Sequence, residues 1–383
     1  MNNDNQDHIP ELRFPQFNEP WKEVNLNELL SFKNGFNGSR EDYGTGIKFI
    51  NVSDILENNF LDYESIDESV NVSEDVKENY LVEYGDIVFQ RSSETREDVG
   101  SANVYLDEEP CIFGGFVIRG KKINEYDPFF LKELLNTARV RREITSWSGG
   151  STRYNIGQDS LNKISIFIPL IEEQKKVASF LSLIDKKIEL LEKKYEKYEK
   201  IKKHYLNEIF QSEKTFNQNL GNLCNIQTGK LDANAMVENG KYRFFTCAKE
   251  YYQIDSYEFD TEALLISGNG ANVGYIHYYN GKFNAYQRTY VLDNFDENVE
   301  IKYIKYFLEK NLQKQIWKEK KEGNTPYIVL STLRDMQISF PDLDEQKKIK
   351  NLFINIDKKM NLINYEISSF NNFKKGLLQK MFI

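Results

Sequence analysis

One stretch of the sequence occurs twice, and this internal repeat constrains the fold more than any other feature. Residues 166–210 begin Ile-Phe-Ile-Pro-Leu-Ile-Glu-Glu-Gln-Lys-Lys, and residues 338–382 repeat the pattern 172 positions later, with 10 identities in the first 23 aligned residues. Such a repeat indicates that the chain is built from two related halves, so it is interpreted before any local pattern. Eight of these ten identities are Pro169, Glu173, Gln174, Lys175, Lys176, Asp185, Lys186 and Lys187, which recur as Pro341, Glu345, Gln346, Lys347, Lys348, Asp357, Lys358 and Lys359.

Both copies continue as a long amphipathic helix. Apolar residues recur at spacings of three and four, which is the 3.5-residue period of a coiled coil, and one polar position in the seam is shared as Lys202 and Lys374. The first seam is Val177, Leu181, Ile184, Ile188, Leu191, Tyr195, Tyr198, Tyr205 and Ile209, and the second is Ile349, Phe353, Ile356, Met360, Ile363, Ile367, Phe370, Leu377 and Met381. Two matched seams predict an antiparallel helix pair within the chain, and two unrelated core helices are the alternative.

The sequence around these helices predicts two globular domains. Short apolar runs typical of strands occupy residues 20–168, together with an amphipathic segment that predicts one helix over residues 127–147. Residues 213–340 repeat this plan: Gly35 recurs as Gly229, Val99-Gly100 as Val273-Gly274, and the loop 150–154 as the loop 323–327. We therefore expect an α/β (α+β) fold with this order: arm 1–19, domain 20–168, helix 169–212, domain 213–340 and helix 341–383.

Composition limits the class of protein only loosely. The formal net charge of -9 does not favour nucleic-acid binding, but net charge is a poor guide when a long chain also carries partner surfaces. Three cysteines without metal or disulfide spacing, and three scattered histidines, indicate a reducing compartment and no metal site. With no signal pattern and no apolar run near 18 residues, we expect a cytoplasmic chain.

The repeated Pro-x-x-x-Glu-Gln-Lys-Lys-Ile/Val helices behind two α/β domains resemble the specificity subunit of Type I restriction–modification systems. The opening Arg13-Phe-Pro-Gln-Phe-x-x-x-Trp21 resembles that family's usual beginning. The resemblance implies two target-recognition domains that each read one half of a split double-stranded DNA target, and a helix pair that sets the unread spacer. It also implies two methyltransferase and two restriction–translocase subunits as partners. S-adenosylmethionine, ATP and Mg are then expected on those partners, with no cofactor and no catalysis on this chain.

The residues themselves agree with a chain that lacks catalytic motifs. There is no Asn/Asp-Pro-Pro-Tyr/Phe run for amino-methyl transfer and no phosphate-binding Gly-x-x-x-x-Gly-Lys loop, which disfavours an autonomous methyltransferase. Phe113-Gly-Gly-Phe116 favours a tight turn over a cofactor loop because it lacks a βαβ context. Asp342, Glu345 and Lys347 resemble a nuclease triad, but they crowd one helix start and face different sides. A coiled-coil scaffold that binds protein without reading DNA remains the alternative.

DNA contact is expected on loops that follow the strands, because Arg, Asn, Gln, Ser and Thr carry base readout. The candidates are Arg91, Ser92, Arg96, Thr152, Arg153, Tyr154 and Asn155 in the first domain, and Asn269, Asn272, Gln287, Arg288, Asn324, Thr325 and Tyr327 in the second. The competing interpretation is ordinary turn capping, since Asn, Gly and Ser favour turns. Residues 186–203 carry eight Lys and four Glu, which indicates a solvated helix face or a surface that screens the DNA spacer.

Overall fold

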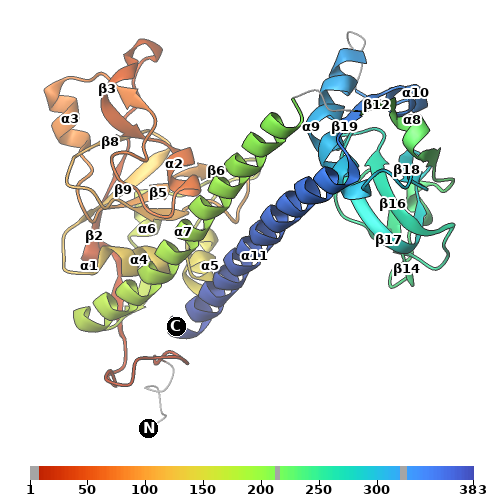
Figure 1. The fold of residues 1–383 in the computed structure, drawn as a ribbon. Coiled ribbons are helices and arrows are strands. Elements are labelled where there is room, and N and C mark those ends of the chain that lie inside the picture. Colours follow the sequence, from red (N-terminus) through yellow and green to blue (C-terminus); the bar gives the residue numbers. More distant parts are fainter. Residues whose placement is uncertain (1–7, 212–215, 320–325) are drawn as a thin grey trace. The chain divides into compact units, whose positions relative to one another are not determined.

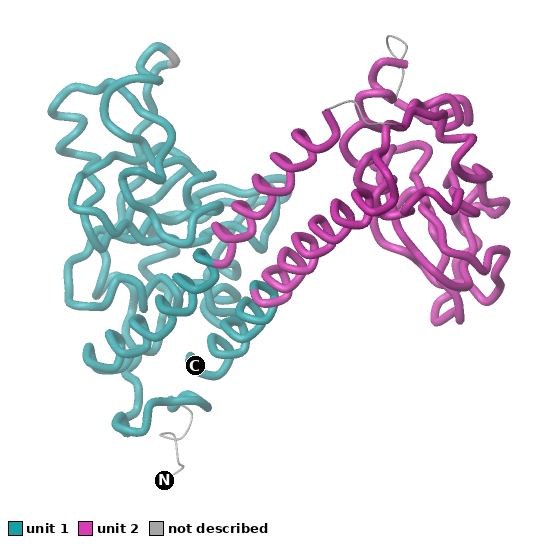
Figure 2. The backbone as a smooth tube through the Cα atoms, viewed as in Figure 1, with its two compact units in different colours: residues 1–190, 367–383 teal, residues 191–366 magenta. Residues whose placement is uncertain are grey.

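The computed structural model describes residues 8–211, 216–319 and 326–383, which form two compact units (Figure 2). One unit comprises residues 1–190 and 367–383, and the other comprises residues 191–366. The two long helices are α7 (Ile171–Ile209) and α11 (Leu343–Met381) (Figure 1). The boundary falls inside both of them, so each unit contains part of each helix (Figure 2). The expected α/β fold with a repeated module is confirmed, whereas the expected separation of helices from domains stays a prediction.

The first unit holds a four-stranded sheet in the order β2-β9-β5-β7 and a three-stranded sheet in the order β4-β3-β8. Two further pairs, β1 with β11 and β6 with β10, are antiparallel. Its elements before α7 are β1 (Lys22–Asn25), α1 (Leu26–Leu29), β2 (Leu30–Asn34), η1 (Arg40–Asp42), β3 (Tyr43–Ile50), α2 (Val52–Glu57), β4 (Ser69–Val70), α3 (Glu74–Tyr80), β5 (Ile87–Gln90), β6 (Ser92–Ser93), β7 (Ala102–Val104), β8 (Ile112–Phe113), β9 (Val117–Lys122), α4 (Pro128–Leu135), α5 (Ala138–Ser146), β10 (Tyr154–Asn155), α6 (Gln158–Leu161) and β11 (Ser165–Ile168).

The second unit repeats this order around a six-stranded sheet, β13-β18-β16-β17-β14-β15, and the pair β12 with β19. The edge β13-β18-β16 corresponds to β2-β9-β5, and the pair β12–β19 corresponds to β1–β11. Its elements between the long helices are β12 (Phe216–Asn219), α8 (Leu220–Leu223), β13 (Asn225–Thr228), η2 (Ala233–Ala235), β14 (Tyr242–Phe245), β15 (Tyr252–Ile254), β16 (Phe259–Ser267), β17 (Ile276–Ala285), β18 (Thr289–Asp293), α9 (Ile301–Glu319), α10 (Leu330–Arg334) and β19 (Gln337–Phe340).

The helix expected over residues 127–147 is in fact two helices, α4 and α5. Asn136 ends the first one, because its side-chain amide donates to the carbonyl of Ala102 at 2.8 Å and to that of Lys132 at 3.0 Å. Asn competes for backbone partners in this way and therefore disfavours a helix interior. In the second unit the corresponding helix α9 is unbroken over 19 residues.

Two glycines confirm that the domains share a frame. Gly100 and Gly274 adopt φ values of 70° and 81°, where glycine is strongly favoured. A Cβ on Gly100 would lie 2.5 Å from Ile144, and one on Gly274 would lie 2.8 Å from Ile316, which stands 172 positions after Ile144. The Val99-Gly100 and Val273-Gly274 turns therefore pack against equivalent helices, α5 and α9.

In each unit the two long helices run antiparallel. The core of the first unit joins the beginning of α7, at Val177, Leu181, Ile184 and Ile188, to the end of α11, at Leu377 and Met381. The core of the second unit joins the end of α7, at Tyr198, Ile201, Leu206 and Ile209, to the beginning of α11, at Ile349, Phe353, Ile356 and Met360. Leu191 and Ile363 are also buried, at 3% exposure each.

The predicted seam is wrong at Tyr205. Its side chain is 38% exposed, and Leu206 packs against the core instead. A straight α-helix has 3.6 residues per turn and drifts away from a strict 3.5-residue repeat, so the residue that faces the partner shifts by one near the helix end.

The shared lysine position is the centre of an ion cluster in each unit. Lys374 lies 2.7 Å from Asp185 and 3.1 Å from Glu133, which comes from α4. In the second unit Lys202 lies 2.9 Å from Asp357 and 3.0 Å from Glu309, which comes from α9. Asp185 and Asp357 are themselves repeat equivalents. Each helix thus supplies one lysine and one aspartate, and the two clusters fix the same antiparallel register.

Partial burial strengthens the attraction between the charges in each cluster, but it also adds a desolvation cost, so each charge needs its partners in place. Burial raises the pKa of Glu133, but Lys132 and Lys374 outweigh it and hold that pKa below its usual value. Burial lowers the pKa of Lys202, but Glu309 and Asp357 outweigh it and raise that pKa. Glu133 and Lys202 are therefore charged at neutral pH, and each cluster depends on its central lysine.

The repeated glutamine explains the Glu-Gln motif. Gln174 is buried, accepts from the backbone N–H of Asp127 at 3.0 Å and donates to the carbonyl of Pro169 at 2.9 Å. Gln346 makes the equivalent bonds, from the N–H of Glu300 at 2.9 Å and to the carbonyl of Pro341 at 2.9 Å. One amide therefore joins the start of each long helix to the start of the domain helix beside it.

We expect Gln346→Ala to destabilise the second unit by about 1–3 kcal/mol, because it leaves the buried carbonyl of Pro341 and the partly buried N–H of Glu300 and carbonyl of Asn298 without this partner. Lys347→Ala, one residue along and exposed, is the matched control and should change stability by less than about 0.5 kcal/mol. Urea unfolding followed by circular dichroism measures both values. Equal effects would show that the amide is not a structural bond.

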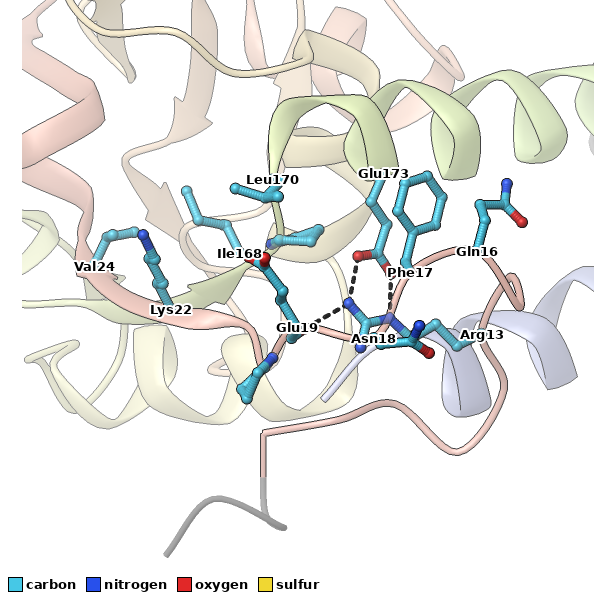
Figure 3. Close-up of a pocket in the computed structure, with 12 residues that line it drawn as sticks. Arg13, Gln16, Phe17, Asn18, Glu19, Lys22, Val24, Ile168, Leu170 and Glu173 are labelled. Carbon is cyan, nitrogen blue, oxygen red and sulfur yellow. Dashed lines mark hydrogen bonds and ion pairs between the residues drawn. The ribbon is translucent and has the colours of Figure 1, made fainter.

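The amino-terminal arm is fastened to the start of α7 (Figure 3). The Arg13 guanidinium donates to both carboxylate oxygens of Glu173, at 2.8 and 2.7 Å, and also to the carbonyl of Glu19. Trp21 is buried and its ring lies edge-on to Phe130 at 5.7 Å. Arg13, Glu19 and Glu173 help to line a pocket of about 230 Å³.

Candidate nucleic-acid interface

In the first domain the structure brings together the two loops that the sequence singled out. β6 and β10 pair antiparallel, with Tyr154 opposite Ser93 and Asn155 opposite Ser92. The Ser92 hydroxyl donates to the Asn155 side chain at 2.5 Å. Residues 91–96 and 149–155 therefore form one surface, although about 60 residues separate them in sequence.

The second of these loops is a hairpin with an exposed tip. Gly149 and Asn155 exchange backbone hydrogen bonds of 3.0 and 2.8 Å. Gly150 has a φ of 124°, and a Cβ there would lie 2.1 Å from the carbonyl of Arg153, so only glycine fits this turn. Thr152 and Arg153 are exposed, whereas Tyr154 packs against the core. The tip thus offers Thr152 and Arg153 to a ligand, and Tyr154 is partly structural.

Two predicted arginines already have intramolecular partners. Arg91 donates through Nη1 to the carbonyl of Gly115 at 3.2 Å, and Arg96 donates through Nε to the carbonyl of Thr145 at 3.3 Å. Arg153 lies 3.9 Å from Glu94, in a pair whose members are both exposed and which contributes little to stability. The side chain of Arg91 is therefore held within the first domain, whereas the side chain of Arg153 is available to a ligand.

In the second domain the predicted asparagines converge on one residue. The Cys247 thiol lies 3.1 Å from the Asn269 Oδ1, and the Asn272 amide donates to the carbonyl of Cys247 at 3.1 Å. Both asparagines belong to the loop between β16 and β17, and Cys247 follows β14. Cys247 was not among the predicted site residues, and no motif in the sequence identifies it.

Gln287 and Arg288 occupy the link between β17 and β18. The Gln287 amide donates to Asp232 at 2.8 Å, which fixes its orientation. Arg288 is exposed, and within residues 8–211, 216–319 and 326–383 no hydrogen bond or ion pair of its guanidinium is recorded. A guanidinium with five available donors is suited to base or phosphate recognition.

The last loop of the second domain is only partly described. Asn324 and Thr325 lie outside the described residues, and Tyr327 is 56% exposed. The Ile156 N–H donates to the carbonyl of Arg91 at 3.0 Å, and the Ile328 N–H donates to that of Gly268 at 2.8 Å. Ile156 and Ile328 are thus equivalent, so Tyr327 corresponds to Asn155. The predicted match of Tyr154 with Tyr327 is wrong by one residue.

A groove of about 840 Å³ in the second unit lies beside this face and includes Asn272 and His277 in its lining. Burial lowers the pKa of His277, although its hydrogen bond with the carbonyl of Ala248 opposes this effect. His277 is therefore neutral at pH 7 and is not a cation for phosphate. In the same groove Lys202 and Lys305 lie against the carboxylates of Glu309 and Asp357, so these two positive charges are balanced by two negative ones.

Other kinds of site find less support in the described part of the chain. No cluster of three His, Cys, Asp or Glu side chains there could hold a metal ion. No helix among those residues is long and apolar enough to cross a membrane.

Comparison with known proteins gives one consistent family. The model of the Type I restriction modification DNA specificity domain matches residues 18–200 and again residues 213–369. The chain therefore belongs to the family of Type I restriction–modification DNA specificity proteins. The double match coincides with the two copies of the fold.

Individual relatives carry the same description. The Type I restriction enzyme EcoDI specificity subunit of Escherichia coli is 42% identical over 130 residues, which are 34% of this chain and 28% of that protein. A putative type I specificity subunit of Mycoplasma genitalium is 23% identical over 281 residues, 67% of this chain and 71% of that protein. The crystal structure of a Type I restriction–modification S subunit from M. genitalium shares the fold, with a TM-score of 0.68 and 18% identity over 98% of this chain and 99% of that one.

Proposed function

We propose that this chain is the DNA specificity subunit of a Type I restriction–modification complex. Each globular domain reads one half of a bipartite double-stranded target, and the helix pair sets the spacer between the halves. The observation that carries the proposal is the repeated frame: two domains share the same backbone hydrogen bonds but present different exposed side chains. A reader of two different half-sites requires this combination, because phosphate contacts can be shared while base contacts must differ.

The chain is proposed to act without chemistry of its own. Its sequence has no amino-methyl-transfer or phosphate-loop motif, so S-adenosylmethionine, ATP and Mg are assigned to the methyltransferase and restriction subunits. The number of these partners, two of each, rests on the resemblance to the family. The complex is proposed to act on cytoplasmic DNA.

A scaffold that binds only protein is the less favoured function. It would explain the helix pair but would not require loops of matching position with Arg, Asn and Gln in both domains. The double family match also favours DNA specificity.

The test is the DNA methylation made by a Type I methyltransferase subunit with and without this chain. Single-molecule sequencing should find adenine methylation in one bipartite motif with the chain and no such motif without it. The isolated chain should bind no S-adenosylmethionine by calorimetry. Identical methylation in the absence of the chain would contradict the proposed role, and cofactor binding by the pure chain would contradict its non-catalytic character.

A further inference from the structure

Two four-residue turns, one in each domain, have the same structure. Gly114–Val117 leads from β8 into β9, and the N–H of Val117 donates to the carbonyl of Gly114 at 2.8 Å. Tyr286–Thr289 leads from β17 into β18, and the N–H of Thr289 donates to the carbonyl of Tyr286 at 2.8 Å. These turns are 172 residues apart, which is the offset of the long helices.

The third residue of each turn makes the same backbone hydrogen bond to a neighbouring loop. The carbonyl of Phe116 accepts from the N–H of Arg91 at 2.8 Å, and the carbonyl of Arg288 accepts from the N–H of Gly268 at 2.9 Å. Arg91 and Gly268 in turn accept from Ile156 and Ile328. Each frame therefore ties the turn to the loop after the central strand and to the last loop of the domain, which are the loops expected to contact DNA.

The two side chains on this frame differ completely. Phe116 is 60% exposed, whereas Phe113, three residues earlier, is fully buried. Arg288 is exposed and has no recorded side-chain partner among the described residues. Both side chains project from a backbone that is already held by hydrogen bonds. Binding of a ligand therefore costs little backbone conformational entropy.

Neighbouring candidates are less free. Gln287 is held by Asp232, Arg91 by the carbonyl of Gly115, and Arg96 by the carbonyl of Thr145. Phe116 and Arg288 thus occupy equivalent positions and are both exposed. Among the described residues, no hydrogen bond or ion pair holds either side chain.

We infer that Phe116 and Arg288 are equivalent base-reading residues, one for each half-site. Arg288 would read guanine, because a guanidinium donates two parallel N–H bonds to O6 and N7 in the major groove. Phe116 would contact the 5-methyl group of thymine, the apolar feature of that groove. This inference rests on the proposed function and names a specificity residue in each domain.

Exchange of the two side chain types is the test, made in the complete complex with its methyltransferase subunit. Arg288→Phe should reduce the preference for guanine at one position of one half-site by about 5- to 150-fold, which corresponds to the 1–3 kcal/mol of a bidentate contact. Phe116→Arg should remove a thymine preference at one position of the other half-site and introduce guanine there. In each case the remaining half-site should be unchanged.

Matched controls separate recognition from charge and from folding. Arg288→Lys keeps the charge but loses the fork and should weaken the guanine preference less than Arg288→Phe. Phe116→Leu keeps an apolar contact and should retain thymine. Glu78→Arg adds a cation to an exposed position of α3, outside the loops assigned to DNA contact, and should leave the methylated motif unchanged. Thermal unfolding of each variant should match the unmodified complex, because every altered side chain is exposed.

The outcome distinguishes this inference from the proposed function. If the unmodified complex makes no bipartite motif, the proposed function fails. If it makes that motif and both Arg288→Phe and Phe116→Arg, folded and active, leave every position of it unchanged, the assignment of these two residues is wrong. A change in base preference confined to one position in each half-site supports the assignment.

Discussion

Ile184→Asp should cost the first unit several kcal/mol of folding free energy, whereas Leu183→Asp, one residue earlier on the same helix, should cost little. Ile184 is 6% exposed and belongs to the core that joins α7 to the end of α11, while Leu183 is 64% exposed. An aspartate at position 184 removes apolar packing and buries a charge without a designed partner, and each effect alone amounts to a few kcal/mol.

Urea unfolding of the two variants measures this difference in folding free energy. Assembly with the methyltransferase subunit should be lost in Ile184→Asp and retained in Leu183→Asp. Similar stability of the two proteins would mean that this face of α7 is not packed against the end of α11.

Lengthening both helices by seven residues should add about three base pairs to the spacer and leave both half-sites unchanged. An α-helix rises 1.5 Å per residue, so seven residues add about 10.5 Å, and B-DNA advances about 3.4 Å per base pair. Seven residues also preserve the repeat of the seam. Insertions after Tyr195 and after Ile363 lie between the two ion clusters on both helices.

By helix rise alone, a four-residue insertion near Tyr195 should lengthen the spacer by about one or two base pairs. The ion clusters predict a different result. Asp185 and Lys202 are 17 residues apart on α7, as are Asp357 and Lys374 on α11, so lengthening one helix displaces one cluster. Removing one partner of a buried ion pair typically costs about 3–5 kcal/mol, so the single insertion should be inactive.

Sequencing of the methylated DNA made by the insertion variants measures the spacer. The single insertion is the control, since it changes length while breaking the register. An active double-insertion variant with an unchanged spacer would show that the helices do not set that distance.

The sequence predicted the helices well because their pattern is local and repeated. Spacing alone located α7 and α11 and identified Lys202 and Lys374 as an unusual shared position. It did not identify Glu133 and Glu309 as partners of those lysines, because these residues come from the domain helices and meet the lysines only through tertiary packing. The break at Asn136 was missed for a similar reason, since its bond to Ala102 joins residues 34 positions apart.

The candidate interface was predicted in its loops but less well in its residues. Glycine, arginine and asparagine marked the loops that the structure gathers, yet composition could not tell which side chains already have partners. The identical tyrosines suggested that Tyr154 matches Tyr327, whereas backbone hydrogen bonds pair Ile156 with Ile328 and shift the match by one. In Phe113-Gly-Gly-Phe116 the two phenylalanines look alike in sequence, but only Phe116 is exposed.

The most direct test of the account is replacement of residues 20–165 with the corresponding domain of a relative that has a different target. Methylation by the resulting complex is mapped by single-molecule sequencing. The account predicts that one half of the motif changes to that of the relative, while the other half and the spacer stay the same. A motif in which both halves change would contradict the assignment of one domain to one half-site.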